Sequence, residues 1–332
     1  MRLLMMATGA FAAPVFRGLY DTHHTVVALV TAPLVATRGK AAAPKSPVRD
    51  IAQQHGTPIF EPEDVNAAPA RQQLAAYQAD LLVVCDYGQI LSPATLATAR
   101  LGGVNLHASL LPKYRGAAPI NWAIYHGATE TGVTVIHMAP QVDAGPCIAQ
   151  ARTPIGPEET AVELEARLAE IGAGVVRRTI DSLETGTLNA LPQDPALASK
   201  APRLKKTDGA IDWSRPAEAI KNQVRALEPW PKTYTYWHRK DGPPMRLILG
   251  PVAVVDRDVS QARPGEVLEA AAGRLLVAAG SGAVLLRSVQ PAGKRMLAVE
   301  EFLRGYHVRV GDLFGPEELG RRTNLRSVPG GR

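Results

Sequence analysis

The stretch VNLHASLLPKYRGAAPINWA, residues 104–123, begins like the end of a buried strand and then changes character. An apolar run ends at Val104, Asn105 and His107 flank Leu106, and a segment punctuated by Pro and Gly follows. Residues two apart on a strand lie on the same face, so Asn105 and His107 are expected to point at a common location. Open α/β sheets bind ligands at the carboxyl ends of their strands, although an isolated pair of this kind is more often structural.

Around this stretch, the first 180 residues alternate strand and helix patterns. This alternation predicts an α/β fold with a mostly parallel sheet and helices on both faces. The chain contains neither a G-x-G-x-x-G nor a Walker A motif, so the usual dinucleotide and P-loop functions are unsupported. The expected strands are 3–6, 25–30, 81–84, 104–106 and 133–138, and the expected helices are 47–54, 67–78, 93–99, 120–126 and 159–183.

The second half of the chain has a different pattern. Residues 188–207 contain three prolines and no sustained period, which indicates a linker. A helix is expected from Ser214 to Leu227, followed by short apolar runs separated by turns and by a helix at 299–304, which is typical of a small antiparallel β-barrel. We therefore expect a first domain at 1–187, the linker at 188–207, a barrel at 208–315 and a disordered tail at 316–332.

Composition places this 332-residue chain among soluble globular proteins, with 46% hydrophobic and 20% charged residues. Two cysteines, Cys85 and Cys147, make no disulfide framework, which favours the cytoplasm. The apolar start after Arg2 weakly imitates a secretory signal, but it reads equally well as a buried strand, a turn and a helix. No apolar run is long enough to predict a membrane span.

Charge is distributed unevenly along the chain. Residues 1–200 carry 15 Lys and Arg against 17 Asp and Glu, which is a net charge of −2. Because the whole chain has a net charge of +6, residues 201–332 have a net charge of +8. The basic second half suggests contact with a polyanion such as nucleic acid, and a merely solubilising surface is the alternative.

A third residue gives the Asn105–His107 pair a chemical interpretation. Asp143 lies in the Gly- and Pro-rich turn VDAGPC, from which it can reach a neighbouring strand end. Imidazole acts as a general acid and base, an amide can stabilise an oxyanion, and a carboxylate can hold a water or accept a proton. With no Ser or Cys nucleophile beside them, these groups suit direct attack by a substrate nucleophile on a carbonyl carbon. We interpret His137 as structural, and expect no metal at His23-His24 because no acidic or Cys partner lies at ligand spacing.

The same residues carry a family resemblance. NLHASLLPKYRGAAPINWAI, residues 105–124, and ETGVTVIHMAPQVDAGP, residues 130–146, resemble the signature of the 10-formyltetrahydrofolate-dependent formyltransferases. The similarity extends over about residues 2–315, through ADLLVVCDYGQIL and DGAIDWSRPAEAIKNQVRALEPWP, and is greatest to members that formylate methionine on initiator tRNA. It implies a Rossmann-like domain followed by an OB-like barrel, in agreement with the patterns above.

The resemblance also implies roles for individual residues, with 10-formyltetrahydrofolate as formyl donor and no metal. Asn105 would polarise the formyl oxygen, His107 would move protons, and Asp143 would tune His107 and order water. The acceptor would be initiator methionyl-tRNA. The protein would act as a monomer, with no membrane among its partners. The residues implied to bind folate are Ser109, Leu110, Leu111, Pro112, Tyr87, Gly88, Ile90, Leu91 and Val142.

The implied tRNA contacts are basic residues, plus one aromatic side chain. Arg38 would enter the acceptor stem, Lys40 and Lys45 would contact phosphates beside it, and Phe11 would face the methionine. The structural alternatives are a solvated loop for the three basic residues and a core aromatic for Phe11. Further phosphate contacts are expected in the barrel at Lys205, Lys206, Lys294 and Arg295. The alternative is that these residues only provide surface charge.

Three residues depart from the family pattern: Ala7 replaces a usual Gly, Gly9 a usual Pro, and Asp86 a small apolar residue beside the folate loop. The loop at 33–47 also lacks the Pro-Asp-Arg sequence that commonly begins it in the family, and this difference affects how the loop would discriminate between tRNAs. Competing functions are formylation of glycinamide ribonucleotide, another small amine or a sugar nucleotide, and RNA binding without catalysis. The basic barrel favours tRNA over the small acceptors, and the retained Asn105, His107 and Asp143 argue against loss of catalysis.

Overall fold

The computed structural model describes residues 1–34, 46–239 and 242–320. They form two compact units. The first unit contains residues 1–120, 129–156 and 163–202, and the second contains 121–128, 157–162 and the described residues from 203 onward. None of the helices in these residues is both long and apolar enough to cross a membrane.

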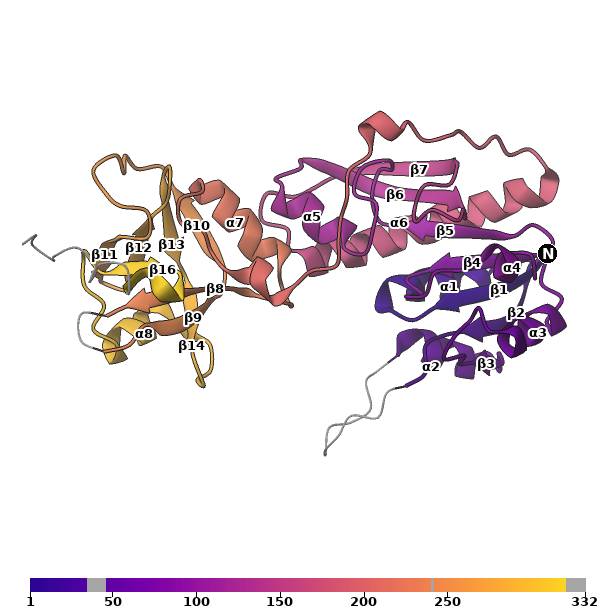
Figure 1. Cartoon of the computed structure of the whole chain (residues 1–332), viewed down its shortest axis with the longest axis horizontal. Helices are drawn as coiled ribbons and strands as arrows, with labels where there is room; N and C mark the ends of the chain where they lie inside the picture. Colours follow the sequence, from indigo (N-terminus) through magenta and orange to yellow (C-terminus); the bar gives the residue numbers. More distant parts are fainter. Residues whose placement is uncertain (35–45, 240–241, 321–332) are drawn as a thin grey trace, which may run out of the picture. The chain divides into compact units, whose positions relative to one another are not determined.

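The first unit is built on one seven-stranded sheet, with strand order β3-β2-β1-β4-β5-β6-β7. The strands from β1 to β5 pair in parallel, whereas β6 and β7 run antiparallel at one edge (Figure 1). The mostly parallel sheet predicted from the sequence is therefore confirmed. The strands are β1 (Arg2–Ala7), β2 (Thr25–Val30), β3 (Ile59–Phe60), β4 (Leu81–Cys85), β5 (Gly103–His107), β6 (Glu130–His137) and β7 (Cys147–Pro154).

Both faces of the sheet are covered. Leu3 and Met5 point to one face and Leu4 and Met6 to the other, and all four are fully buried. A strand with two buried faces reads as an unbroken apolar run, which is why the sequence pattern located β1 and β4 well. The helices are α1 (Ala13–Leu19), α2 (Pro47–Gln54), α3 (Ala68–Ala76), α4 (Pro93–Leu96), α5 (Pro119–Tyr125) and α6 (Ala161–Thr185), with the 3-10 turns η1 (Ala10–Ala12) and η2 (Pro195–Leu197).

Three features of the first unit were not predicted. The edge strand β3 is only two residues long and was not among the expected strands. Strand β7 has mostly partly exposed side chains, so it lacks the apolar run that marks the other strands. The segment 188–202, expected as linker, is tied to the first unit, because Leu191 pairs with Cys147 and Lys200 with Arg115. Only its last residues, from Arg203, belong to the second unit.

The second unit contains a closed antiparallel barrel. Its two sheets have the orders β10-β13-β12-β11 and β15-β14-β9-β8-β16. They join where Gly250 N donates to Ser288 O (2.9 Å) and where Glu266 bridges to Leu313, so that strands surround one core containing Trp213, Trp237 and Phe314. The elements are η3 (Lys206–Gly209), α7 (Ala217–Ala226), β8 (Thr233–His238), β9 (Met245–Leu249), β10 (Val252–Val255), β11 (Val267–Ala271), β12 (Arg274–Ala278), β13 (Ala283–Leu286), β14 (Ser288–Pro291), β15 (Leu297–Ala298), α8 (Val299–Gly305), β16 (Leu313–Gly315) and η4 (Glu317–Gly320).

The barrel expectation is confirmed in its antiparallel β-structure. Within it, the chain passes at Arg287 from β13 to β14, which belong to different sheets. The predicted tail contains η4 at its start, and its residues 321–332 lie outside those described.

Candidate active site

Three polar side chains meet at the carboxyl end of β5. Asn105 and His107 lie two residues apart on this strand, and His107 is only 5% exposed. Asp143 reaches them from the loop between β6 and β7: its Oδ1 lies 3.5 Å from Asn105 Nδ2 and its Oδ2 lies 3.6 Å from His107 Nδ1. The three residues predicted as chemically active therefore form one cluster.

The hydrogen bonds of His107 indicate which nitrogen exchanges a proton. His107 Nε2 donates to the backbone carbonyl of Tyr114 at 2.9 Å, which assigns the permanent proton to that atom. In the neutral ring Nδ1 is then the basic atom. It faces Asp143 Oδ2 at 3.6 Å.

Asp143 is positioned by groups that the sequence did not reveal. Gly116 N donates to Asp143 Oδ2 at 2.9 Å, and Gln193 Nε2 donates to the carbonyl oxygens of Asp143 and Gly145, at 2.8 Å each. Arg115 in turn donates to Gln193 Oε1. Gln193 lies in the presumed linker, 50 residues away along the chain, so no sequence pattern connected it to the site.

Glycine is required at position 116. Its φ of +125° is unfavourable for other residues, and a Cβ there would lie 2.5 Å from Ala201 O. The close approach of residues 199–201 follows from hydrogen bonds in both directions, since Arg115 N donates to Ser199 O and Ala201 N donates to Arg115 O. The loop after His107 is thus clamped by residues 199–201, which keeps the Gly116 N–H aimed at Asp143.

The SLLP segment is held by buried hydrogen bonds. Thr134 Oγ1 donates to Ser109 O at 2.6 Å and accepts from Leu111 N at 3.1 Å, while Ser109 Oγ donates to Lys113 O. Ser109 and Leu111 are buried, whereas Leu110 and Pro112 are half-buried, so only the latter two present surface toward a ligand.

The other loops expected to bind folate expose apolar side chains. Ile90, after β4, is 66% exposed and Val142, before Asp143, is 49% exposed, although large apolar residues normally lie inside. Tyr87 and Leu91 are buried beneath them, and burial raises the pKa of Tyr87 to about 12, with a further contribution from Asp64. Gly88 is exposed with a φ of +89°. Exposed apolar groups at this end of the sheet suit a flat aromatic ligand.

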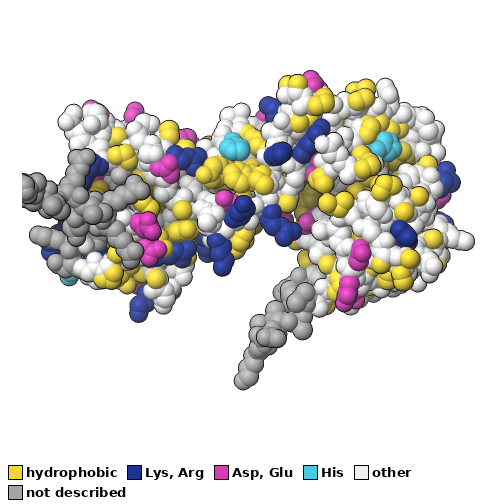
Figure 2. Space-filling model, viewed as in Figure 1, with side chains coloured by type: hydrophobic (Ala, Val, Ile, Leu, Met, Phe, Trp, Pro, Cys, Tyr) yellow, Lys and Arg dark blue, Asp and Glu magenta, His cyan; other side chains and the backbone are white. Residues whose placement is uncertain are grey.

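The predicted tRNA contacts are placed only in part. Arg38, Lys40 and Lys45 lie outside the described residues. Phe11, in η1, is 7% exposed, so in this structure it is a core aromatic. Charged side chains of both signs lie on the visible surface (Figure 2), and in the second unit Lys205, Lys206, Lys294 and Arg295 are all exposed, with Arg295 paired to Glu301.

Strained backbone also occurs at this end of the sheet. Asp86, Tyr114 and Asp143 have φ values of +49°, +61° and +50°, in the left-handed region that non-glycine residues seldom adopt. Such residues concentrate at functional sites, where the surrounding structure holds them in place. Asp143 and Tyr114 belong to the cluster above, and Asp86 follows the neighbouring strand.

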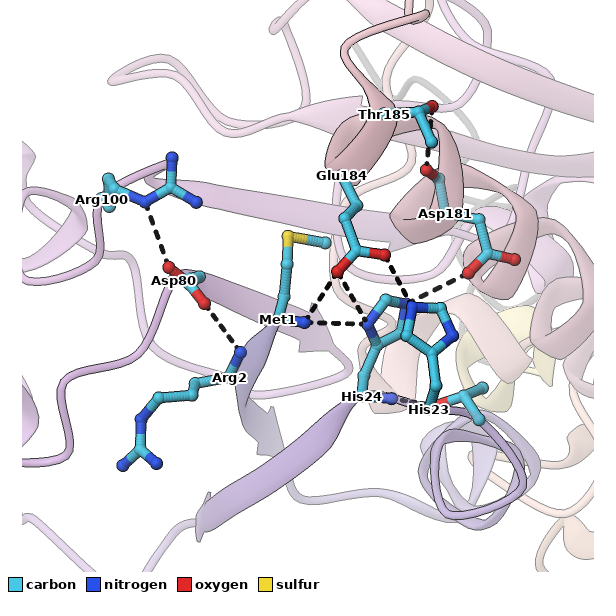
Figure 3. A network of polar contacts seen from close by, with 10 residues as sticks. Met1, Arg2, His23, His24, Asp80, Arg100, Asp181, Glu184 and Thr185 are labelled. Carbon is cyan, nitrogen blue, oxygen red and sulfur yellow. Dashed lines mark hydrogen bonds and ion pairs between the residues drawn. The ribbon is translucent and has the colours of Figure 1, made fainter.

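His23 and His24 lie at the opposite end of the sheet (Figure 3). The sequence offered them no acidic partner, but the fold brings Asp181 and Glu184 from the last turns of α6. His24 Nε2 donates to Asp181 Oδ1 at 3.1 Å, and His23 Nε2 donates to Glu184 Oε2 at 2.6 Å. Ligand atoms of His23, His24 and Asp181 lie within 4.8 Å of one another, so the argument from sequence against a metal was incomplete. In this structure the four residues bind one another.

Comparison with known proteins agrees with this geometry. A family model described as "Formyl transferase" matches residues 1–180, and one described as "Formyl transferase, C-terminal domain" matches residues 203–307. Methionyl-tRNA formyltransferase of Rhodopirellula baltica is 41% identical over 94% of this chain and 96% of its own length. The enzyme of the same name from Symbiobacterium thermophilum is also 41% identical, over 97% of this chain and 98% of its own.

Solved structures resemble the fold at low sequence identity. An N-formyltransferase from Helicobacter canadensis, in complex with folinic acid and dTDP-3-aminofucose, has a TM-score of 0.65 at 16% identity, covering 87% of this chain and 98% of its own. HypX from Aquifex aeolicus with tetrahydrofolic acid has a TM-score of 0.59 at 16% identity, covering 91% of this chain and 47% of its own. With two family models matched in order and relatives near 40% identity over almost the whole chain, this protein belongs to the formyltransferase family.

Proposed function

We propose that the protein transfers the formyl group of 10-formyltetrahydrofolate to the α-amine of methionine on initiator tRNA. The observation that carries the proposal is the Asn105–His107–Asp143 cluster, which holds an amide donor and a proton-transfer group but no Ser or Cys nucleophile. Such a site leaves the nucleophilic attack to the substrate, and an amine is nucleophilic enough to attack a formyl carbon directly. The relatives that match almost the whole chain, named for this reaction, support the same acceptor.

The chemistry follows from the geometry. The amine lone pair attacks the formyl carbon, and the carbonyl electrons move to oxygen, where Asn105 Nδ2 stabilises the negative charge. His107 Nδ1 takes up the proton that the amine loses and delivers it to N10 of the folate as the carbon–N10 bond breaks. Asp143 stabilises the intervening imidazolium. The products are formyl-methionyl-tRNA and tetrahydrofolate, with no covalent enzyme intermediate.

Placement of the two substrates follows from the same features. Folate would lie against Ile90, Val142 and the half-buried Leu110 and Pro112. The tRNA would contact the exposed lysines of the barrel unit, because neutralised phosphates dominate such binding. We further propose that the protein acts as a monomer in the cytoplasm, with residues 1–187 as the catalytic domain.

The test is a formylation assay with purified protein, 10-formyltetrahydrofolate and methionine-charged initiator tRNA. We expect the parent to produce formyl-methionyl-tRNA and His107→Ala to lose about 10²–10⁴-fold in rate while keeping its fold. Matched reactions with glycinamide ribonucleotide and an amino-sugar nucleotide address the competing acceptors. Product only with one of these small acceptors would contradict the proposal, as would tRNA binding by a folded parent that forms no product.

A further inference from the structure

Asp86 is an acidic residue at the candidate active site that the proposed reaction does not use. It follows β4 directly, and Val84 of β4 is the register partner of Asn105 on β5. The neighbour of β4 on one side, β5, carries Asn105 and His107 at its carboxyl end. On the other side the carbonyl oxygen of Asp86 accepts from Thr8 N (2.9 Å) and Gly9 N (3.3 Å). Asp86 is therefore held between the ends of β1 and β5.

The Asp86 carboxylate lies directly against Gly9. A Cβ built on Gly9 would fall 1.6 Å from Asp86 Oδ2, so no other residue at position 9 is compatible with this carboxylate position. The departures from the family pattern at positions 9 and 86 are therefore linked in space. Gly9 lacks the side chain that its usual Pro would have, and the Asp86 carboxylate occupies that position. Gly9 directly precedes η1, which contains Phe11.

The carboxylate lacks the partners that normally accompany such a group. Among the described residues, Asp86 has no hydrogen bond to its carboxylate and no ion pair, and its backbone has a φ of +49°. Asp86 is exposed as a residue, but its carboxylate lies against Gly9 and is partly desolvated there. This desolvation, with a smaller contribution from the negative charge of Glu165, raises the pKa of Asp86 to about 6. A strained, unpaired carboxylate beside a reaction centre is a binding group for a cation or a hydrogen-bond donor of the substrate.

We propose that Asp86 is a specificity-determining residue that binds the amino group of the formyl acceptor and that Gly9 is glycine in order to admit it. The inference rests on the proposed function. In that reaction the aminoacyl acceptor is the substrate that presents a cationic group. The glutamate tail of a folate carries negative charge and would be repelled. A charge-assisted hydrogen bond from the α-ammonium holds the nitrogen at the site. The ammonium releases one proton to solvent to become the attacking amine, and the proton that the amine loses on attack goes to His107.

The experiment is a double-mutant cycle between positions 9 and 86. Asp86→Ala is expected to raise the KM for methionyl-tRNA about tenfold, as loss of one charge-assisted hydrogen bond implies, and to leave the KM for 10-formyltetrahydrofolate within twofold. Gly9→Ala displaces the carboxylate without removing it and should give a similar increase. In the Asp86→Ala background, Gly9→Ala should have no further effect, because there is no carboxylate left to displace.

Two control variants separate this role from general damage. Gly18→Ala adds a Cβ that meets no atom within 4 Å, and Glu63→Gln removes an exposed charge from the same unit, so neither should change either KM. An unchanged acceptor KM in Asp86→Ala would overturn the inference. A rise in the folate KM instead would also overturn it, since Asp86 would then belong to the donor subsite.

A binding measurement distinguishes failure of this inference from failure of the proposed function. Calorimetry with a non-hydrolysable 3′-amide analogue of methionyl-adenosine requires no turnover. Binding by the parent that Asp86→Ala weakens supports the inference even if the parent formylates no tRNA. Equal binding by the two proteins, or no binding by the parent, refutes it whatever the formylation assay shows.

Discussion

The amino and carboxyl ends of the parallel sheet in the first unit differ in how their charged groups are paired. At the amino end the charged groups are paired (Figure 3): Asp80 accepts from Arg2 N at 2.8 Å and from Arg100 Nε at 3.1 Å, and the main-chain nitrogen of Met1 donates to Glu184 at 3.0 Å. At the carboxyl end the carboxylate of Asp86 has no partner among the described residues, and Asp143 is shared between Asn105, His107 and Gly116.

This contrast separates stability from function within one sheet. Paired charges at the amino end stabilise the folded chain, and Gln78, which has a left-handed φ of +50° there, accepts a hydrogen bond from Arg2 Nε through its carbonyl oxygen. The carboxyl end holds three non-glycine residues at positive φ and exposes Ile90 and Val142. Proteins commonly retain such unfavourable features where activity requires them, at a cost in stability.

The largest effect that tests this contrast is expected for Asp143→Asn. The amide preserves shape and tolerates the positive φ, but it cannot stabilise the imidazolium of His107. We expect the rate of formyl transfer to fall about 10²–10³-fold, while the free energy of unfolding changes by less than about 1 kcal/mol. Single-turnover kinetics and urea titration measure the two quantities. Near-normal transfer by this variant would remove Asp143 from the mechanism.

The same substitution at the opposite end, Asp80→Asn, should have the reverse outcome. Its carboxylate accepts two hydrogen bonds, so we expect the free energy of unfolding to fall by about 1–2 kcal/mol and the transfer rate to stay within twofold. The bond from Arg2 N, followed by the contribution of Arg100, lowers the pKa of Asp80. The stabilisation is therefore present above the ordinary carboxyl range and is lost on acidification, and parent and variant should converge in urea titrations at low pH.

Asp86→Asn should increase stability. Because the pKa of Asp86 in the fold is about 6, above its ordinary value of 3.8, ionisation at neutral pH destabilises the folded chain. The variant removes this cost, and we expect a gain of about 1 kcal/mol at pH 7 after allowance for solvent screening. Thermal unfolding of both proteins between pH 4 and 8 should show the gain growing from about pH 4 to about pH 6 and staying constant above that. A gain that does not depend on pH would exclude this explanation.

The smallest effect is expected for Glu184→Gln. The hydrogen bond from His23, then that from the Met1 nitrogen, lowers the pKa of Glu184 to about 2 from an ordinary value of 4.5. The contribution to stability is thus complete above about pH 4.5 and disappears as the pH falls to about 2. Differential scanning calorimetry should show a slightly lower unfolding temperature for the variant at pH 7 and none of this difference near pH 2. A larger effect than that of Asp80→Asn would reverse the proposed order.

Prediction from the sequence succeeded where a local pattern has one physical meaning. Unbroken apolar runs located the doubly buried strands β1 and β4, and residues two apart placed Asn105 and His107 at one strand end. It failed where exposure or distant pairing decides the structure. Strand β7 is half-exposed and lacks an apolar run, and the 188–202 segment looks like a linker because its contacts are made by backbone groups and by Gln193.

The amino-acid sequence by itself determined the α/β fold, the barrel that follows it and the three chemical residues, because these depend on periodicity and on a signature confined to two short segments. Tertiary structure alone decided which groups surround them. Gly116 and Gln193 orient Asp143, and Gly9 makes room for Asp86, through contacts between positions tens of residues apart. Such contacts depend on distances of a few ångströms between separate strands and loops, and these distances exist only once the sheet has formed.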